Sequence, residues 1–173
     1  GKRLLERAID AAHSAGCAHI AVVGPERELN LQDSVSSSLV REDPPYSGPL
    51  AAISAARDLG QGEWVLLLAT DVPNISAVIE FLTEAIKAQP EVAAHLIESP
   101  NGHLEWLSSA MRRSDFEREL AAQPDLGVGV KRLFERLDYV RHQDSDGITL
   151  DVDTPQDWHE AQAEWARVNR SGT

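Results

Sequence analysis

Apolar residues in this chain gather into short runs and helical stripes that are separated by polar turns. The most continuous run covers residues 64–69 (WVLLLA) and is followed by Thr70, Asp71, Val72 and Pro73. A run this unbroken predicts a strand that is covered on both faces, as in the centre of a parallel sheet. Because Pro73 disfavours the helical region at Val72, we expect the chain to stay extended there and to hold Asp71 at the rim of the sheet.

Helical spacing and short apolar runs predict the other elements. Helices are expected over residues 4–15, 50–59, 75–87, 114–122 and 130–137, and from residue 155 onward. Strands are expected over residues 19–23, 39–41, 92–97, 104–107, 139–140 and 148–150, with a hairpin turn at Asn101-Gly102. This alternation predicts one α/β domain over residues 1–173, with three layers around a doubly wound, mostly parallel sheet.

The composition is typical of a globular protein. The chain has 173 residues, of which 42% are hydrophobic and 25% charged, and no apolar run approaches the length of a membrane span. The single cysteine, Cys17, cannot form an internal disulfide and fits a reducing cytosol. We therefore expect a cytoplasmic protein with no membrane partner, in which Cys17 packs at a turn rather than acting as a nucleophile.

The formal net charge of −12 restricts the possible partners. It speaks against nucleic acid, whose phosphates would be repelled. A nucleoside triphosphate would meet the same field, so backbone amides, a few cations or a metal ion would have to overcome it. An acidic protein that handles nucleotides is therefore expected to depend on a divalent cation.

Asp71 is the first candidate site residue, because ligands of open α/β sheets bind at the carboxyl ends of the strands. A carboxylate there without a Cys or His partner suits a hard cation such as Mg²⁺ and a phosphorylated ligand. The alternative is an ordinary turn residue, a common role for Asp at the end of a strand. The apolar strand before Asp71 favours the ligand role.

Residues 43–49 (DPPYSGP) form the second candidate, with Asp43, Gly48 and Pro49 as its site residues. Pro49 at the first helical position, with Gly48 before it, leaves the amides of the first turn free and the positive end of the helix dipole outward. Such a terminus favours a phosphate or nucleoside contact. A Pro-rich helix start without any ligand explains the same pattern equally well.

The third candidate is Asp153, within residues 150–157 (LDVDTPQD). Helix capping alone explains Thr154 as the cap, Pro155 at the first helical position and Asp157 in the first turn. Capping does not explain Asp153, which would sit beside the ligand end of the sheet and could supply a second metal carboxylate. Both interpretations stay open at this point.

These segments together resemble the MobA-type nucleotidyltransferases, the molybdenum cofactor guanylyltransferases. The resemblance rests on residues 1–5 (GKRLL), 22–24 (VVG), 42–43 (ED), 48–51 (GPLA), 70–73 (TDVP) and 153–155 (DTP). It implies a Rossmann-like nucleotidyltransferase fold and Mg²⁺-dependent transfer of GMP from GTP to molybdopterin, with release of pyrophosphate. By position it implies that Asp71 is catalytic and binds Mg²⁺ and the nucleotide phosphates, and that Asp43, Gly48 and Pro49 contact GTP. A molybdoenzyme or its chaperone is implied as a further partner.

The chain also departs from that family. The family opens with a strand and a Gly-rich loop that holds the guanine and the triphosphate, and this sequence contains no such loop. We expect that segment to exist in the parent protein. Many relatives carry Asn-x-Asn where this chain has residues 151–153 (DVD), and often a Gln near Glu105 and Trp106. A cytidylyltransferase, a nucleotidyltransferase with another acceptor, and a non-catalytic nucleotide-binding module are the alternatives.

Overall fold

Helices and strands alternate along most of the chain, as the hydrophobic pattern predicts. The structure is a computed structural model that describes residues 4–29, 31, 34–123 and 127–149. Its elements in chain order are α1 (Leu4–Ser14), β1 (Ile20–Val23), β2 (Ser37–Val40), α2 (Pro49–Ala55), β3 (Trp64–Leu68), α3 (Ile75–Ala88), β4 (Ala94–Glu98), β5 (Leu104–Arg112), α4 (Arg113–Ala121), the 3₁₀ helix η1 (Val130–Leu133) and β6 (Tyr139–Gln143).

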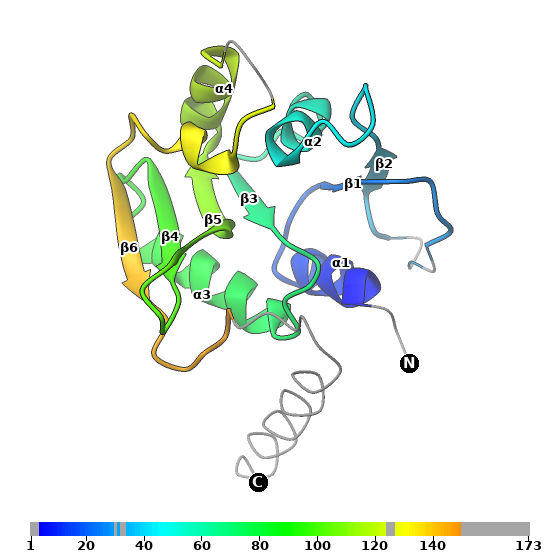
Figure 1. Cartoon of the computed structure of the whole chain (residues 1–173). Helices are drawn as coiled ribbons and strands as arrows, with labels where there is room; N and C mark the ends of the chain where they lie inside the picture. The colour runs from blue at the N-terminus through cyan, green and yellow to red at the C-terminus, as the bar shows by residue number, and fades with distance from the viewer. Residues whose placement is uncertain (1–3, 30, 32–33, 124–126, 150–173) are drawn as a thin grey trace, which may run out of the picture.

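The described strands form two sheets (Figure 1). In the four-stranded sheet the order is β3-β5-β4-β6, with β5 antiparallel to both of its neighbours and β4 parallel to β6. β1 and β2 form a separate parallel pair. The predicted hairpin joins β4 to β5, and Gly102 adopts a φ of 79° in its turn, which favours glycine.

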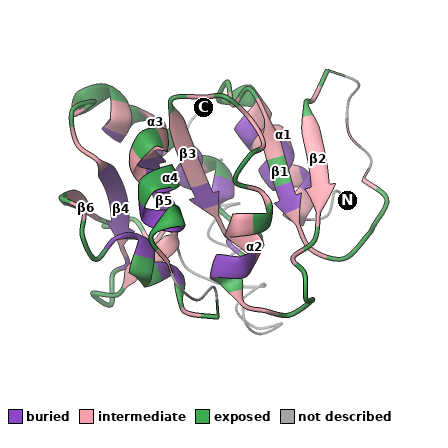
Figure 2. Ribbon diagram, turned by 90° about the horizontal axis from the view of Figure 1, so that it is seen from above, coloured by how far each residue is buried: buried purple, intermediate pink, exposed green. Residues whose placement is uncertain are grey.

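Helices cover both faces of the four-stranded sheet, which gives the three layers predicted from the sequence. α1 and α3 pack on one face, where Ala12 and Leu82 belong to one buried cluster. α2, α4 and η1 supply residues such as Leu50 and Phe116 to a second cluster on the other face. Figure 2 shows buried residues on the strands and on the helices that flank them. The predicted mixed α/β class with three layers is thereby confirmed.

The strand β3 is covered on both faces, as predicted. Val65 and Leu67 pack toward the cluster of α2 and α4, whereas Leu66 and Leu68 pack toward the cluster of α1 and α3. The expectation that this strand is central was wrong for the described residues, because β3 lies at the end of the four-stranded sheet. Among those residues β3 pairs only with β5 and β1 only with β2, so each leaves one edge without a strand partner.

Local signals decide where several elements end. Gly16 adopts a φ of 88°, and the amides of Gly16 and Cys17 donate to the carbonyls of His13 and Ala12, which is the Schellman arrangement that closes a helix. Two predicted elements were wrong. The apolar stripe at residues 130–137 forms only the short η1, and Ile148 and Thr149 lie in a turn rather than a strand. The predicted final helix and Asp153 lie outside the described residues.

Candidate functional site

Asp71 lies on the surface shortly after β3, which ends at Leu68. The Ala69 amide donates to the Leu107 carbonyl at 2.9 Å, which extends the pairing with β5 by one residue. Val72 is buried and anchors the segment, and α3 begins at Ile75, which is buried as well. Asp71 between these anchors is exposed. Among the described residues, none forms an ion pair or a hydrogen bond with its carboxylate, which is therefore open to a ligand.

The second candidate segment follows β2 and leads into α2. Gly48 adopts a φ of 95°, a left-handed conformation that favours glycine, and Pro49 begins the helix as predicted. Leu50 is fully buried and fixes the helix against the core, whereas Asp43 and Pro49 are exposed. α2 has only seven residues, so the field at its N-terminus is weak, and its free amides are the more useful feature for a ligand.

The fold brings the two segments to the same end of the strands. β1, β2 and β3 point the same way in Figure 2. The loop after β2 and the segment after β3 therefore both lie at the same end of these strands. Within the described part of the chain no hydrogen bond joins Asp71 to residues 43–49. The arrangement therefore places two separate candidate binding elements at one end of the sheet.

The loop after β2 contains two candidate residues, Arg41 and Tyr46, that were not predicted from the sequence. The Tyr46 amide donates to Oε1 of Glu42 at 2.8 Å, and the Arg41 guanidinium lies 5.3 Å from the centre of the Tyr46 ring. Hydrogen bonds from the backbone amides of Glu42 and Tyr46 lower the pKa of the Glu42 carboxyl, which keeps it ionised. An aromatic residue between prolines and a Ser-Gly-Pro turn was the only signal of this arrangement in the sequence.

Oxygen donors are the available ligands for a metal at this end of the sheet. The described ranges contain no group of three or more His, Cys, Asp or Glu side chains that could hold a metal ion by themselves. Asp71 alone fits Mg²⁺ or Mn²⁺ in the manner of phosphate-dependent sites, where one or two carboxylates act together with substrate phosphates and water.

Burial raises the pKa of the Cys17 thiol, which agrees with its predicted packing role.

Trp106 packs within the core. Its ring centre lies 5.3 Å from that of Phe134 and 6.4 Å from that of Tyr139. These ring contacts give Trp106 a packing role against the hydrophobic core. Two hollows of about 650 and 420 Å³ lie between α1 and α3 and beside Arg112 and Arg113, and none of the predicted site residues lines either one.

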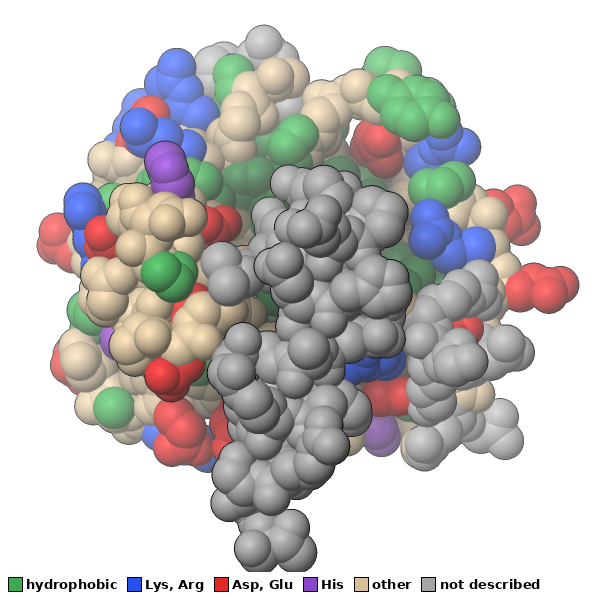
Figure 3. Space-filling view, turned by 60° about the horizontal axis from the view of Figure 1, so that its bottom comes forward, with side chains coloured by type: hydrophobic (Ala, Val, Ile, Leu, Met, Phe, Trp, Pro, Cys, Tyr) green, Lys and Arg blue, Asp and Glu red, His purple; other side chains and the backbone are tan. Residues whose placement is uncertain are grey.

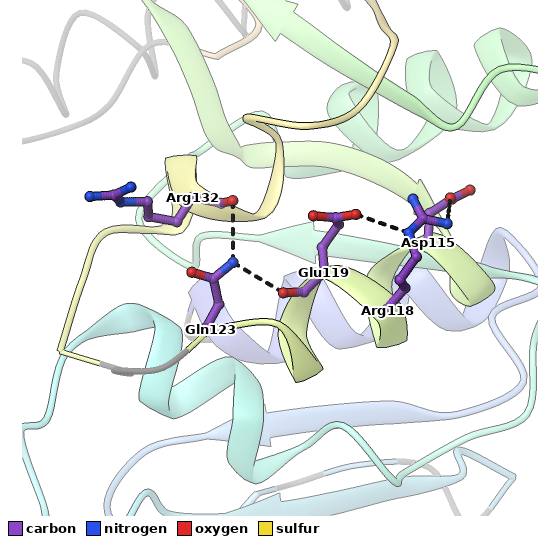
Figure 4. Close-up of polar contacts among 5 residues, drawn as sticks. All are labelled: Asp115, Arg118, Glu119, Gln123 and Arg132. Atoms are coloured by element: carbon purple, nitrogen blue, oxygen red, sulfur yellow. Dashed lines mark hydrogen bonds and ion pairs between the residues drawn. The ribbon is translucent and has the colours of Figure 1, made fainter.

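A polar cluster on α4 lies outside the candidate site (Figure 4). Arg118 pairs with Asp115 at 2.5 Å and with Oε1 of the buried Glu119 at 3.0 Å. The Gln123 side chain donates to the Glu119 and Arg132 carbonyls at 3.0 and 3.5 Å, which ties the end of α4 to η1. Glu119 Oε2 is buried and has no hydrogen-bond partner. These contacts fix α4 against η1, a structural role.

Charge on the visible surface is mixed. In Figure 3 acidic and basic side chains are interspersed over the parts of that face that grey atoms leave visible, and no broad basic area is seen there. No helix within the described ranges is long and apolar enough to cross a membrane. The mixed surface and the net charge of −12 agree with a ligand bound through local contacts rather than through a basic face.

Comparison with protein families decides the relationship. A family model described as the MobA-like NTP transferase domain matches residues 1–143. The chain belongs to the MobA-like NTP transferase family. It is therefore a member of a nucleotidyltransferase family, and the matched range contains Asp43, Gly48, Pro49 and Asp71 but not Asp153. No curated protein sequence matches the chain.

Solved structures confirm the predicted Rossmann-like nucleotidyltransferase fold at low sequence identity. The 2-C-methyl-D-erythritol 4-phosphate cytidylyltransferase of Thermus thermophilus is 14% identical, with a TM-score of 0.69 over 96% of this chain and 90% of that one. The molybdopterin-guanine dinucleotide biosynthesis protein A of Archaeoglobus fulgidus is 22% identical, with a TM-score of 0.52 over 75% and 69%. Rv0371c of Mycobacterium tuberculosis H37Rv in complex with manganese is 20% identical, with a TM-score of 0.59 over 91% and 84%.

Proposed function

We propose that this protein is a Mg²⁺-dependent guanylyltransferase that transfers GMP from GTP to the phosphate of molybdopterin and releases pyrophosphate. The observation that carries the proposal is the exposed, unpaired carboxylate of Asp71 at the carboxyl end of β3, in a chain of the MobA-like NTP transferase family. The expected site of action is the cytoplasm, and a molybdoenzyme or its chaperone is the proposed recipient of the product.

In the proposed reaction a phosphate oxygen of the acceptor attacks the α-phosphorus of GTP in line. The bond from that phosphorus to the oxygen that bridges it to the β-phosphate breaks, and pyrophosphate leaves with the electron pair. A divalent cation, when bound, neutralises charge on the α-phosphate and on the leaving group. Asp71 holds that cation, with Asp153 proposed as a second carboxylate. In a chain of net charge −12, holding two anions next to each other is most of the task.

Asp43, Gly48 and Pro49 are proposed to contact the nucleotide. A carboxylate accepts hydrogen bonds, so Asp43 suits N–H or O–H groups of the nucleoside rather than its phosphates. The first turn of α2 is proposed to offer the backbone amides of Leu50 and Ala51, which have no carbonyl partner within the helix and no side-chain cap, although their side chains are buried. This segment and Asp71 follow strands that end on the same side, which lets one nucleotide contact both.

The proposal includes a strand and a Gly-rich phosphate-binding loop ahead of residue 1. The unpaired edges of β1 and β3, within the described part of the chain, support a place for such a strand between the two sheets. Each preorganised donor to developing phosphate charge contributes about 3 kcal/mol to transition-state stabilisation. The loop would therefore decide whether turnover is measurable, and assays require the whole gene product.

The proposal is tested by pyrophosphate release from GTP and from CTP with molybdopterin as acceptor, in Mg²⁺ and after chelation. We expect release from GTP that depends on the acceptor and is lost with chelator. Preference for CTP would instead support a cytidylyltransferase, the activity named for the Thermus thermophilus structure. Nucleotide binding without pyrophosphate release would support a non-catalytic module and would refute the proposal.

A further inference from the structure

Tyr46 is exposed and at the same time fixed in an unfavourable backbone conformation. The residue is 88% exposed, and its φ of 65° lies in the left-handed region that residues other than glycine avoid. A buried ring could offset that cost by packing, but this ring lies in water. Non-glycine residues held in such conformations concentrate at ligand-binding segments, where the surrounding contacts fix them.

Three contacts of the loop hold Tyr46 in place. Its amide donates to the Glu42 carboxylate at 2.8 Å, and the Ser47 hydroxyl donates to the Pro44 carbonyl, which closes the turn around the tyrosine. The Arg41 guanidinium lies over the ring, 5.3 Å from its centre. A cation at this distance is attracted by the face of the ring. One face of Tyr46 therefore carries Arg41, and the exposure of the side chain leaves the other face open.

The charge of Arg41 is available to a ligand. Its side chain is exposed and forms no ion pair within the described residues, although its charge helps to lower the pKa of the neighbouring Glu42 carboxyl. Other arginines are paired, such as Arg112 with Glu63 and Arg132 with Glu135. In a protein of net charge −12, a guanidinium without an ion-pair partner next to an exposed aromatic ring is a local positive group that favours an anionic ligand.

We propose that Tyr46 and Arg41 form a platform for a flat heteroaromatic ring that carries a phosphate group. The ring stacks on the open face of Tyr46, and its phosphate extends past the edge of the Tyr46 ring toward the charge of Arg41, which lies over the other face. The loop that carries the platform leads into α2 on the same side of the strands as Asp71, so one ligand could contact both. A role of the platform in group transfer therefore rests on the proposed function. A nucleotide base and the pterin of the acceptor share this chemistry, and the experiment separates them.

The experiment measures equilibrium binding to the whole protein of GMP, CMP, pterin-6-carboxylate and, as a probe without a flat ring, ribose 5-phosphate. The variants are Tyr46→Ala, which removes the ring, and Tyr46→Phe, which keeps it. Arg41→Gln removes the charge, and Arg57→Gln, an exposed arginine just after α2, is its matched control. Tyr46→Gly and Tyr46→Ala both lack the ring, but only glycine adopts the positive φ without steric cost. Tyr46→Gly should therefore melt at a higher temperature than Tyr46→Ala.

We expect Tyr46→Ala to lose about 5- to 100-fold in affinity for one class of ring-bearing probe, the range of a single stacking contact. Ribose 5-phosphate binding should be unchanged, and Tyr46→Phe should bind like the wild type. Arg41→Gln should weaken the same probe, whereas Arg57→Gln should not. The class of probe that loses affinity, nucleotide or pterin, identifies the ring that stacks on Tyr46.

Two results overturn the platform: equal affinity of the wild type for ring-bearing probes and ribose 5-phosphate, or unchanged affinities in Tyr46→Ala. The proposed function fails separately. If the wild type binds the ring through Tyr46 and releases no pyrophosphate, the platform stands and the transferase does not. If the wild type turns over and Tyr46→Ala keeps the KM for both substrates, the transferase stands and the platform does not.

Discussion

The imidazole of His95 on β4 and that of His142 on β6 share a hydrogen bond, with Nδ1 of His95 3.0 Å from Nε2 of His142. His95 is fully buried, and its ring also lies 5.5 Å from the ring of Trp64. A hydrogen bond between two ring nitrogens holds one proton, so a doubly protonated pair would place two N–H groups against each other. The pair therefore favours at least one neutral ring.

Acidification is predicted to destabilise the protein through this pair. Burial lowers the pKa of both histidines, and on His95 the charge of His142 lowers it further, against smaller opposing effects of the Gln89 carbonyl and Glu91. In the unfolded chain both rings take up protons near pH 6.5, whereas the lowered pKa values shift protonation of the folded pair to lower pH. The unfolded state then binds more protons, so stability is retained above pH 6.5 and falls below it.

The measurement is urea unfolding at pH 7.5, 6.5 and 5.5. The buried His95 contributes at most about 1.4 kcal/mol per pH unit to the decline of the free energy of unfolding below pH 6.5. His142→Gln keeps a partner for His95 without a titrating ring and should flatten the decline. The exposed His103→Gln is the control and should leave it unchanged. An unaltered decline in His142→Gln would contradict this assignment.

Asp144 is predicted to stabilise the turn that follows β6. Its buried carboxylate accepts the amides of Ile148 and Thr149 at 3.0 and 2.9 Å and the Thr149 hydroxyl at 2.7 Å. Burial raises the pKa of Asp144, but hydrogen bonds from the Thr149 hydroxyl and from the amides of residues 147–149 together lower it. Asp144→Ala leaves buried donors without an acceptor and should cost about 2–3 kcal/mol.

Denaturant unfolding at pH 7 measures that loss. Thr149→Val, which removes only the hydroxyl, should cost about 1 kcal/mol, and Thr149→Ser should restore it. Because the pKa of Asp144 is lowered in the folded state, its contribution is present above the ordinary Asp pKa and disappears as the pH falls through the lowered value. A wild-type midpoint for Asp144→Ala would mean that these bonds do not stabilise the turn.

The apolar pattern was sufficient for the elements whose burial is continuous. The run at residues 64–68 became β3, and the helical stripe at residues 75–87 became α3, since local hydrophobic spacing is the signal for both. The stripe at residues 130–137 misled because Val130, Leu133 and Phe134 can be buried by a 3₁₀ turn as well as by an α-helix. The order of strands, which places β3 at an end, depends on long-range pairing that no local pattern encodes.

The same distinction between local sequence signals and long-range contacts applies to the candidate site and to the polar contacts. The exposed position of Asp71 after β3 could be predicted from sequence, because a strand followed by a carboxylate and Val-Pro is a contiguous signal. The pairing of His95 with His142 could not, since the residues lie 47 positions apart and meet only through the parallel pairing of β4 and β6. The open face of Tyr46 likewise depends on the backbone conformation of its loop, which the residue types do not reveal.

Glu119 is predicted to depend on Arg118. Its carboxylate is buried, and Oε1 faces Arg118 while Oε2 has no hydrogen-bond partner (Figure 4). Side-chain hydrogen bonds to Asp115 and Glu119 raise the pKa of Arg118, so the guanidinium stays charged. Arg118→Met should lower the free energy of unfolding, since it leaves a buried charge without a cation.

A double-mutant cycle tests this coupling by thermal or urea unfolding. Glu119→Gln removes the charge that must be compensated and should be close to the wild type in stability. The double variant should therefore recover most of the loss seen in Arg118→Met. If the changes in the free energy of unfolding caused by the two substitutions simply add, the ion pair between these residues does not stabilise the fold.

Asp71 is predicted to act in catalysis without supporting the fold. Asp71→Asn keeps the size and polarity of the side chain and removes the charge proposed to hold the cation. Since the loss of one preorganised electrostatic contact costs about 3 kcal/mol, we expect kcat/KM for pyrophosphate release to fall by at least about 100-fold. The unfolding midpoint should stay near that of the wild type, because the side chain is exposed and pairs with none of the described residues. Asp58→Asn, an exposed carboxylate just after α2, is the control and should keep full activity. Equal activity of the Asp71 and Asp58 variants would mean that the carboxylate at the end of β3 is only a turn residue.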